Sequence, residues 1–340
     1  MSYLTDIANA FVLLSNFVLL PALAYGSQLA LGALGVTLVF GILRFANFAH
    51  GDMMAFGTMI AVLLTWWLQA QGVSLGPLPT ALLALPVAIV VTAALAVLID
   101  NWVFAFYRHK KSPPVTLVIA SVGVMFILNA VVRFVIGTED QRFADGERFI
   151  ITAREFRDMT GLAEGLAVQS TKALTIVVAV AVMVALFAFL QYSRTGKAMR
   201  AYSDNEDLAL LSGVDPDRVV MVTWVIAAAL ATIAGVLYGL DKSFKPFTYF
   251  QLLLPIFASA IVGGIGQPVG AVVGGYVIAF SEVFATYAYK KFFDYLLPEG
   301  LAPEGLAQLL STDYKFAVSF VILVVVLLVR PTGIFRGRVL

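Results

Sequence analysis

Long apolar runs alternate with short polar connections along most of this chain. The runs are continuous and do not alternate at period two, so they predict helices rather than strands. Several reach the length of about 20 residues that a helix needs to cross the apolar core of a bilayer. Because lipid offers no partners for backbone N–H and C=O groups, we expect an all-α polytopic membrane protein, with one transmembrane domain over residues 1–340.

We expect eight to ten membrane segments, including broken or half-length helices. The first run, 7–23, is short and contains Asn9, Asn16 and Pro21, so it either crosses the membrane or lies at its interface. The run at 251–262 is too short to span alone and leads through a glycine-rich stretch into the next run. The other apolar runs are 25–43, 48–68, 80–106 (with a tilt or kink expected near Pro86), 115–136, 173–190, 219–240, 269–289 and 314–329.

The polar connections fall into two groups when successive runs cross the membrane in alternate directions. One group carries ten Lys and Arg in 45 residues, whereas the other carries eight in 77. The first consists of 107–114, 193–218 and the tail, which includes Arg330, Arg336 and Arg338; the second consists of 71–79, 137–171, 241–250 and 290–312. Because basic residues favour the cytoplasmic side, we predict that 193–218 is a cytoplasmic loop and that acidic 137–171 is extracytoplasmic.

The loop at 193–218 combines high charge with the signals of a folded helix. Nine of its 26 residues are charged, against 13% of the whole chain. The sequence from Ser203 to Glu206 fits a capping box, in which the Ser203 hydroxyl accepts from a free N–H and Glu206 reaches back. Asp204, Glu206 and Asp207 then lie in the first turn, where the helix dipole favours negative charge.

The same short helix has an apolar face and a defined end. Leu208 and Leu211 are three residues apart and therefore share a face. Gly213 supplies a left-handed residue that ends the helix, and Asp215 with Pro216 starts the next one. A capped helix on a membrane-surface loop indicates a contact site for another molecule.

Composition removes several classes of function. Hydrophobic residues make up 61% and mean hydropathy is +0.93, which argues against soluble domains, and a net charge of +1 gives no reason to expect nucleic acid. Cysteine is absent, so disulfides and thiolate chemistry are excluded. Gly196-Lys197 does not complete a P-loop, because Gln191 stands where the pattern needs glycine. The first basic residue is Arg44, so we expect no cleaved secretory signal.

Polar residues at the start of the run at 48–68 are pathway candidates. Asn47, His50 and Asp52, with Gly51 between them, would line a transport pathway in one interpretation. In the other interpretation, which we favour, they form a helix N-terminus at the cytoplasmic face. Asn47 would then cap the helix, and the negative charge of Asp52 would interact favourably with the helix dipole.

The glycine-rich stretch between the runs at 251–262 and 269–289 allows two interpretations, to which we give equal weight. Gly263, Gly264 and Gly266 interrupt a helix, which suits a hinge or a pathway lining. Alternatively they form a tight turn with close packing, because Gly266, Gly270 and Gly274 have small-xxx-small spacing.

Glu282 lies well inside an apolar run. A carboxylate there is a functional candidate because its desolvation is costly. The slightly favoured alternative is a structural pair with Arg133 or another buried donor. For Asp100 and Asn129, which also lie in apolar runs, the same two roles are possible, but the case for a functional role is weaker.

Five segments occur in the order and register of a known family. They are 43–51 (LRFANFAHG), 192–201 (YSRTGKAMRA), the turn at 209–213, 262–266 (VGGIG) and 330–334 (RPTGI). Together, from about residue 22 to 335, they resemble the permease subunit of ABC importers for branched-chain amino acids. Two features depart from the family pattern: the loop at 290–312 is longer, and Arg44 replaces a usually uncharged residue.

The resemblance implies how the chain works. The stretch 194–215, including Arg194, Gly196 and Arg200, would be the coupling loop that docks on a cytoplasmic ATPase, which binds ATP and Mg²⁺. This chain would then be no enzyme and carry no cofactor or metal. A second related permease, an extracytoplasmic substrate-binding protein and membrane lipid would be its other partners, in a bacterial-type cytoplasmic membrane. The alternatives are an ABC permease for urea or short amides, and an ion-coupled secondary transporter or channel.

Overall fold

The computed structural model describes residues 3–297, 303 and 305–335, so Arg336 and Arg338 of the predicted basic tail lie outside the described residues. Within this part, nine helices are long and apolar enough to cross a membrane, which confirms the all-α expectation and the range of eight to ten segments. The elements are α1 (Tyr3–Leu14), α2 (Leu20–Leu43), α3 (His50–Ala70), α4 (Ala81–Ile99), α5 (Ala105–His109), α6 (Pro114–Ile136), β1 (Phe149–Ile151), α7 (Ala153–Thr160), β2 (Val168–Gln169), α8 (Ser170–Tyr192), α9 (Arg194–Asp204), α10 (Glu206–Leu211), α11 (Pro216–Asp241), α12 (Pro246–Gly263), α13 (Pro268–Thr286), α14 (Lys290–Leu296) and α15 (Lys315–Val329), with π-helical turns at Ser15–Leu19 and Asp100–Phe104 and a 3-10 turn at Thr312–Tyr314.

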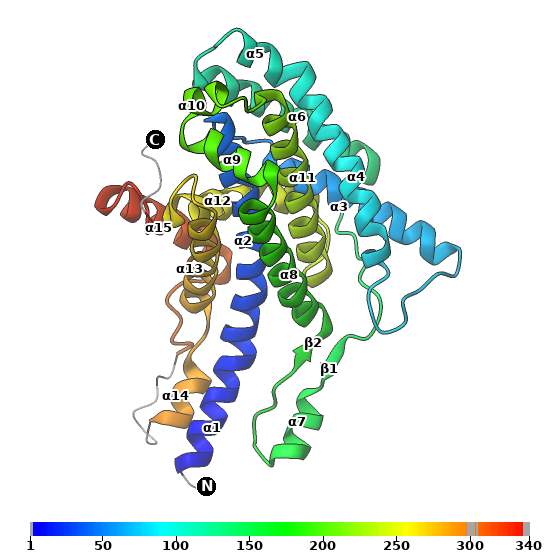
Figure 1. Cartoon of the computed structure of the whole chain (residues 1–340). Coiled ribbons are helices and arrows are strands. Elements are labelled where there is room, and N and C mark those ends of the chain that lie inside the picture. Colours follow the sequence, from blue (N-terminus) through cyan, green and yellow to red (C-terminus); the bar gives the residue numbers. More distant parts are fainter. Residues whose placement is uncertain (1–2, 298–302, 304, 336–340) are drawn as a thin grey trace.

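The first two apolar runs form one helix, so the expectation of a separate segment at 7–23 is wrong. Helices α1 and α2 join through the π-helical turn Ser15–Leu19 into a span of 41 residues, Tyr3–Leu43. Pro21 lacks a backbone N–H, and the wider turn just before it accommodates the missing hydrogen bond. Asn9 and Asn16 do not break the helix because their side chains bind the loop beside it. Figure 1 shows this long helix rising from the N-terminus through most of the height of the molecule, to a point below α5.

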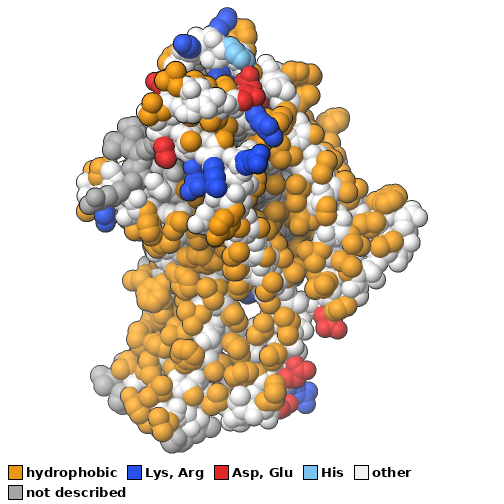
Figure 2. Space-filling view, viewed as in Figure 1, with side chains coloured by type: hydrophobic (Ala, Val, Ile, Leu, Met, Phe, Trp, Pro, Cys, Tyr) orange, Lys and Arg blue, Asp and Glu red, His pale blue; other side chains and the backbone are white. Residues whose placement is uncertain are grey.

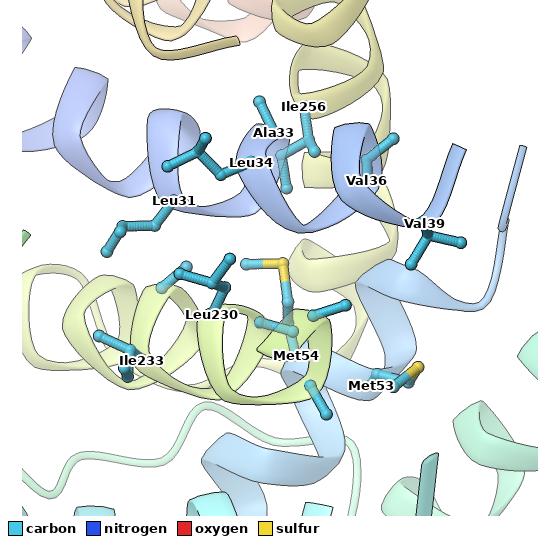
Figure 3. Close-up of a cluster of buried hydrophobic side chains, with 14 of the residues drawn as sticks. Leu31, Ala33, Leu34, Val36, Val39, Met53, Met54, Leu230, Ile233 and Ile256 are labelled. Carbon is cyan, nitrogen blue, oxygen red and sulfur yellow. The ribbon is translucent and has the colours of Figure 1, made fainter. Parts of the chain in front are cut away.

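The core lies where α2 and α11 pack against each other and against α3, α12 and α13. Figure 3 shows Leu31 of α2 near Leu230 of α11 and Met54 of α3, with Ile256 of α12 on the opposite side of α2 and Leu34 within the same cluster. All five side chains are buried. Helices α4, α6, α8 and α15 have much more exposed apolar surface, as expected for helices that face lipid.

The two ends of the bundle carry the two predicted groups of connections. Helices α5, α9 and α10 lie together at one end, and α7, α14 and the N-terminus lie at the other (Figure 1). Figure 2 shows Lys, Arg, Asp and Glu at the first end and a broad apolar band below it. The loops at 107–114 and 193–218 thus lie together, opposite 137–171. Because the first end holds these basic loops, we refer to it as the cytoplasmic end and to the other as the outer end.

Three contacts bring the outer connections together. Backbone groups of Gln141 and Phe244 exchange two hydrogen bonds of 2.8 Å, which joins the loop at 137–171 to the one at 241–250. Asp145 accepts from the backbone of Thr80 at 2.7 Å. Lys291 forms an ion pair with Glu164 at 3.0 Å. The outer loops therefore form one connected layer rather than separate linkers.

The loop at 137–171 is itself folded. Strands β1 and β2 pair antiparallel, and α7 stands between them in the sequence. Thr152 and Glu155 form a capping box at the start of α7, and hydrogen bonds from Thr152 lower the pKa of Glu155. Asn9 of α1 accepts hydrogen bonds of 3.1 Å from the backbone of Ala163 and Glu164.

Helices α4 and α5 are also continuous, over Ala81–His109, with Pro86 inside α4 and a π-helical turn at Asp100–Phe104. Asp100 forms a bidentate ion pair with Arg108 at 2.8 and 3.1 Å. Asp100 therefore has a structural partner near the cytoplasmic end.

Candidate functional site

The loop at 193–218 folds into two short helices. Ser193 caps α9 by accepting a hydrogen bond from the Gly196 backbone at 2.8 Å. Gly196 is buried against Phe189 and Leu190, where any side chain would collide with the backbone of α8. Arg194 and Arg200 are exposed, and Arg200 reaches the carbonyl of Gln191 at 3.5 Å.

The predicted capping box is wrong by two residues. Helix α9 continues through Asp204, so Ser203 has helical backbone and cannot serve as an N-cap. Asn205, with an extended backbone (φ −153°), caps α10 instead by accepting from the Leu208 backbone at 3.0 Å. Asp204 consequently ends α9, whereas Glu206 and Asp207 occupy the first turn of α10 as expected.

Glu206 does not reach back to a backbone N–H. Its carboxylate accepts from the Tyr202 hydroxyl at 2.7 Å, which ties α10 to the last turn of α9. Burial and this carboxylate raise the pKa of Tyr202, so the hydroxyl remains a donor at physiological pH.

The end of α10 is built as predicted. Gly213 has φ +81°, its N–H binds the carbonyl of Leu210, and Val214 N–H binds that of Ala209, both at 3.0 Å. These two bonds are a Schellman motif. Asp215 then caps α11 by accepting from the Asp217 backbone at 3.0 Å.

Leu208 and Leu211 point away from the protein. Their side chains are 61% and 85% exposed, although Ala209 between them is buried. Helix α10 thus presents two leucines and two acidic residues, Glu206 and Asp207, at the cytoplasmic end of the molecule. Exposed leucines on a rigid, capped helix are suited to burial against another protein.

Helix α3 begins inside the bundle rather than at the cytoplasmic face. His50 is fully buried, and its ring packs on Gly35, two turns before the end of α2. Asp52 accepts from Asn129 in the middle of α6 at 2.7 Å. The prediction that Asn47 caps α3 is wrong, because the N-cap is Ala49, which has no side-chain cap. Asn47 instead accepts from the backbone of Ala49 at 3.1 Å, in the turn that leads into α3.

The glycines of this region serve close packing. A side chain on Gly51 would meet the carbonyl of Tyr249. The side-chain atoms of Asn47, His50 and Asp52 that face the interior make few hydrogen bonds among the described residues. A role for Asn47, His50 and Gly51 in the pathway stays a prediction.

The stretch at 263–267 forms a tight turn between α12 and α13. Gly264 and Gly266 have φ of +113° and +82°, which favours glycine. Side chains on Gly263 or Gly274 would collide with the carbonyls of Gly270 and Ser259. The close-packing interpretation is therefore observed, and the role of Gly263, Gly264 and Gly266 as a hinge stays a prediction.

Glu282 is buried and has a structural partner, although not Arg133. Ser319 of α15 donates a hydrogen bond to its carboxylate, and Lys315 lies close enough to interact with it electrostatically. The guanidinium of Arg133 lies 5.9 Å from the ring centre of Phe247 instead. The alternative of another buried donor is the one the structure supports, and it links α13 to α15.

An apolar groove of about 620 Å³ lies between α12, α15 and the segment before α3. The rings of Phe48 and Phe257, both in its lining, are in contact, with ring centres 5.3 Å apart and planes tilted by 37°. Sequence reasoning missed this groove, because its residues come from three segments whose side chains resemble those of any membrane helix. The lining residues are Ala46, Phe48, Phe250, Gln251, Leu253, Leu254, Phe257, Ile261, Phe316 and Leu323.

These features define a class of protein: a multi-pass, all-α membrane protein whose loop at 193–218 folds into two short, capped helices at one end of the bundle. The family described as “Branched-chain amino acid transport system / permease component” matches residues 18–327, and the chain belongs to this family. The resemblance carried by the five segments is thereby confirmed, as is a location in the cytoplasmic membrane.

Curated relatives agree with this assignment over nearly the whole chain. The “High-affinity branched-chain amino acid transport system permease protein LivH” of Escherichia coli K12 is 32% identical over 317 residues, covering 92% of both chains. The corresponding protein BraD of Pseudomonas aeruginosa is 31% identical, covering 94% of this chain and 95% of its own. A probable LivH of Methanocaldococcus jannaschii is 28% identical, covering 94% and 92%. These relatives are named as permeases, which are transport components rather than enzymes.

Proposed function

We propose that this chain is the membrane-spanning subunit of an ABC importer that moves branched-chain amino acids across the cytoplasmic membrane by alternating access. Membership of the permease family and the names of the relatives support this function. The observation that carries the ATP-driven mechanism is α10, with exposed Leu208 and Leu211 on a helix capped at both ends.

In this proposal a separate cytoplasmic ATPase grips α9 and α10. Leu208 and Leu211 enter a groove on the ATPase, and Arg194, Arg200, Glu206 and Asp207 form polar contacts around them. ATP and Mg²⁺ bind to that partner, which is consistent with the incomplete P-loop pattern at Gly196 in this sequence. Closure of the ATPase would push the α9–α10 pair and switch the pathway between its two openings.

A second permease subunit completes the pathway. The apolar groove between α12 and α15 would form part of its wall, and its aromatic and aliphatic side chains suit the side chains of leucine, isoleucine and valine. On the outer side, the folded loop at 137–171 would receive a substrate-loaded binding protein. Its exposed Arg154 and Asp158 offer charged groups of both signs to that partner.

The alternatives have less support. Permeases for urea or short amides are related, but the relatives reported above are named for branched-chain amino acids. An ion-coupled transporter needs a chain of ionisable groups across the membrane. In the described structure Glu282, Asp100 and Asp52 each bind a different local partner, Ser319, Arg108 and Asn129, and do not form a relay.

Reconstitution tests the function directly. The purified complex of this chain with its second permease, ATPase and binding protein is placed in vesicles, and uptake of labelled leucine and urea is followed with and without ATP. We expect leucine uptake that requires ATP, is abolished by an ATPase variant unable to hydrolyse it, and persists with proton and sodium ionophores. Urea uptake, or leucine uptake driven by an ion gradient without nucleotide, would contradict the proposal.

A further inference from the structure

The connection between α2 and α3 holds an arginine in an unusual backbone conformation. Arg44 follows the last residue of α2 and has φ +59° and ψ +27°, with its N–H bound to the carbonyl of Phe40 at 3.0 Å. Residues other than glycine adopt this left-handed conformation rarely. Glycine would fit the backbone better, so the side chain of Arg44 needs an explanation of its own.

That side chain joins α2 to the loop at 193–218. The Arg44 guanidinium donates a hydrogen bond of 2.5 Å to the carbonyl of Ser203 in the last turn of α9. Carbonyls in the last turn of a helix have no partner within it and carry the negative end of the dipole, so a cation is favoured there. The Ser203 hydroxyl also donates to the carbonyl of Gly41 at 3.2 Å. We name these two hydrogen bonds the α2–α9 joint.

On the α9 side, the joint adjoins the helix that is proposed to dock on the ATPase. Asn205 alone separates the end of α9 from the start of α10. Tyr202, one residue before Ser203, is bound to Glu206 of α10. A displacement of α10 therefore acts on the Ser203 carbonyl through short, hydrogen-bonded helix ends.

On the α2 side, the joint adjoins the wall of the apolar groove. The non-helical segment from Arg44 to α3 packs inward, with the Phe45 ring 5.2 Å from that of Phe104. The backbone N–H of Phe48 binds the Ser121 hydroxyl at 3.1 Å, and the Phe48 ring lies 5.3 Å from that of Phe257 on α12. Non-helical backbone at membrane depth is typical of segments that border a cavity.

We propose that Arg44 is a positioning residue that transmits movement of α9 and α10 to the segment at 44–49 and so to the groove wall at Phe48. The proposal rests on the proposed function, because it assumes that an ATPase moves α10. It differs from a simple capping role, in which the Arg44 guanidinium would stabilise the end of α9 and loss of its side chain would lower stability without changing how ATP use and transport are linked.

The test replaces Arg44 by glycine in the complete complex reconstituted in vesicles with binding protein. Glycine suits φ +59°, so R44G removes the guanidinium and keeps the backbone conformation. We expect leucine uptake to fall about tenfold, equivalent to about 1.4 kcal/mol, while ATP hydrolysis stays within about twofold. The measured quantity is the number of ATP molecules hydrolysed per leucine imported.

Two further variants separate the guanidinium from the backbone. K111G makes the same kind of change at exposed Lys111, which also has positive φ (+51°) at the cytoplasmic end, and it should leave the ratio of ATP to leucine unchanged. R44K keeps a cation that can reach the Ser203 carbonyl, so it should recover part of the uptake lost in R44G.

Several results would overturn the inference. Wild-type uptake in R44G would show that the α2–α9 joint transmits nothing. A parallel fall of uptake and ATP hydrolysis in R44G, or loss of the ATPase from the complex, would make Arg44 a structural residue. Absence of ATP-dependent leucine uptake in the wild-type complex would instead overturn the proposed function, and the inference with it.

Discussion

Replacing Leu211 by alanine should weaken binding of the ATPase without unfolding the permease. Leu211 is 85% exposed, so it contributes little to the fold and nearly its whole side chain is available for burial in an interface. The change removes three carbons, each worth about 0.8 kcal/mol when buried, so we expect a loss of about 2 kcal/mol and association about 30-fold weaker. Alanine favours helix, so α10 itself should persist.

The assay measures binding of the purified ATPase to the detergent-solubilised permease, together with the melting temperature of each variant. M159A is the matched control: Met159 is 70% exposed on a short helix, α7, at the outer end, and its removal should not affect ATPase binding. Wild-type ATPase affinity in L211A, or equal losses in L211A and M159A, would refute the docking role of α10.

Three further predictions concern stability. Lowering the pH should loosen the start of α7: the folded pKa of Glu155 lies below its ordinary value of 4.5, so the capping contribution is present above pH 4.5 and is lost as pH falls below it, which hydrogen exchange of the α7 amides would show. G213A should cost about 1 kcal/mol, because alanine is strained at φ +81°, and should speed hydrogen exchange at the end of α10; unchanged exchange would contradict this. G274A should lower the melting temperature, because its side chain would collide with the carbonyl of Ser259, whereas G123A, in open space on α6, should leave it unchanged or raise it.

The hydrophobic pattern was sufficient for the membrane helices because bilayer thickness and backbone hydrogen bonding leave few alternatives. It could not show that 7–23 and 25–43 are one helix. Asn9, Asn16 and Pro21 suggest a break in the sequence, whereas the structure binds the asparagines to the outer loop and places a π-helical turn before the proline. Such compensation depends on tertiary contacts that no local pattern contains.

In the loop at 193–218, too, the sequence predicted some features correctly and others not. Gly213 and Asp215 were predicted correctly because a left-handed stop and an N-cap are local requirements. The N-cap of α10 was misplaced because both Ser203 and Asn205 can cap a helix, and only the continuation of α9 decides between them. The partner of Glu282 is Ser319, 37 residues away, which no spacing rule predicts.

The long helix formed by α1 and α2 connects the two faces of the membrane mechanically. About 50 Å of helix separates Asn9, which holds the outer loop, from the last turn of α2, at a rise of about 1.5 Å per residue. A tilt of about 5° around the cytoplasmic end of such a lever moves its outer end sideways by about 4 Å. A movement at one end of this continuous helix would therefore displace the groups bound at its other end.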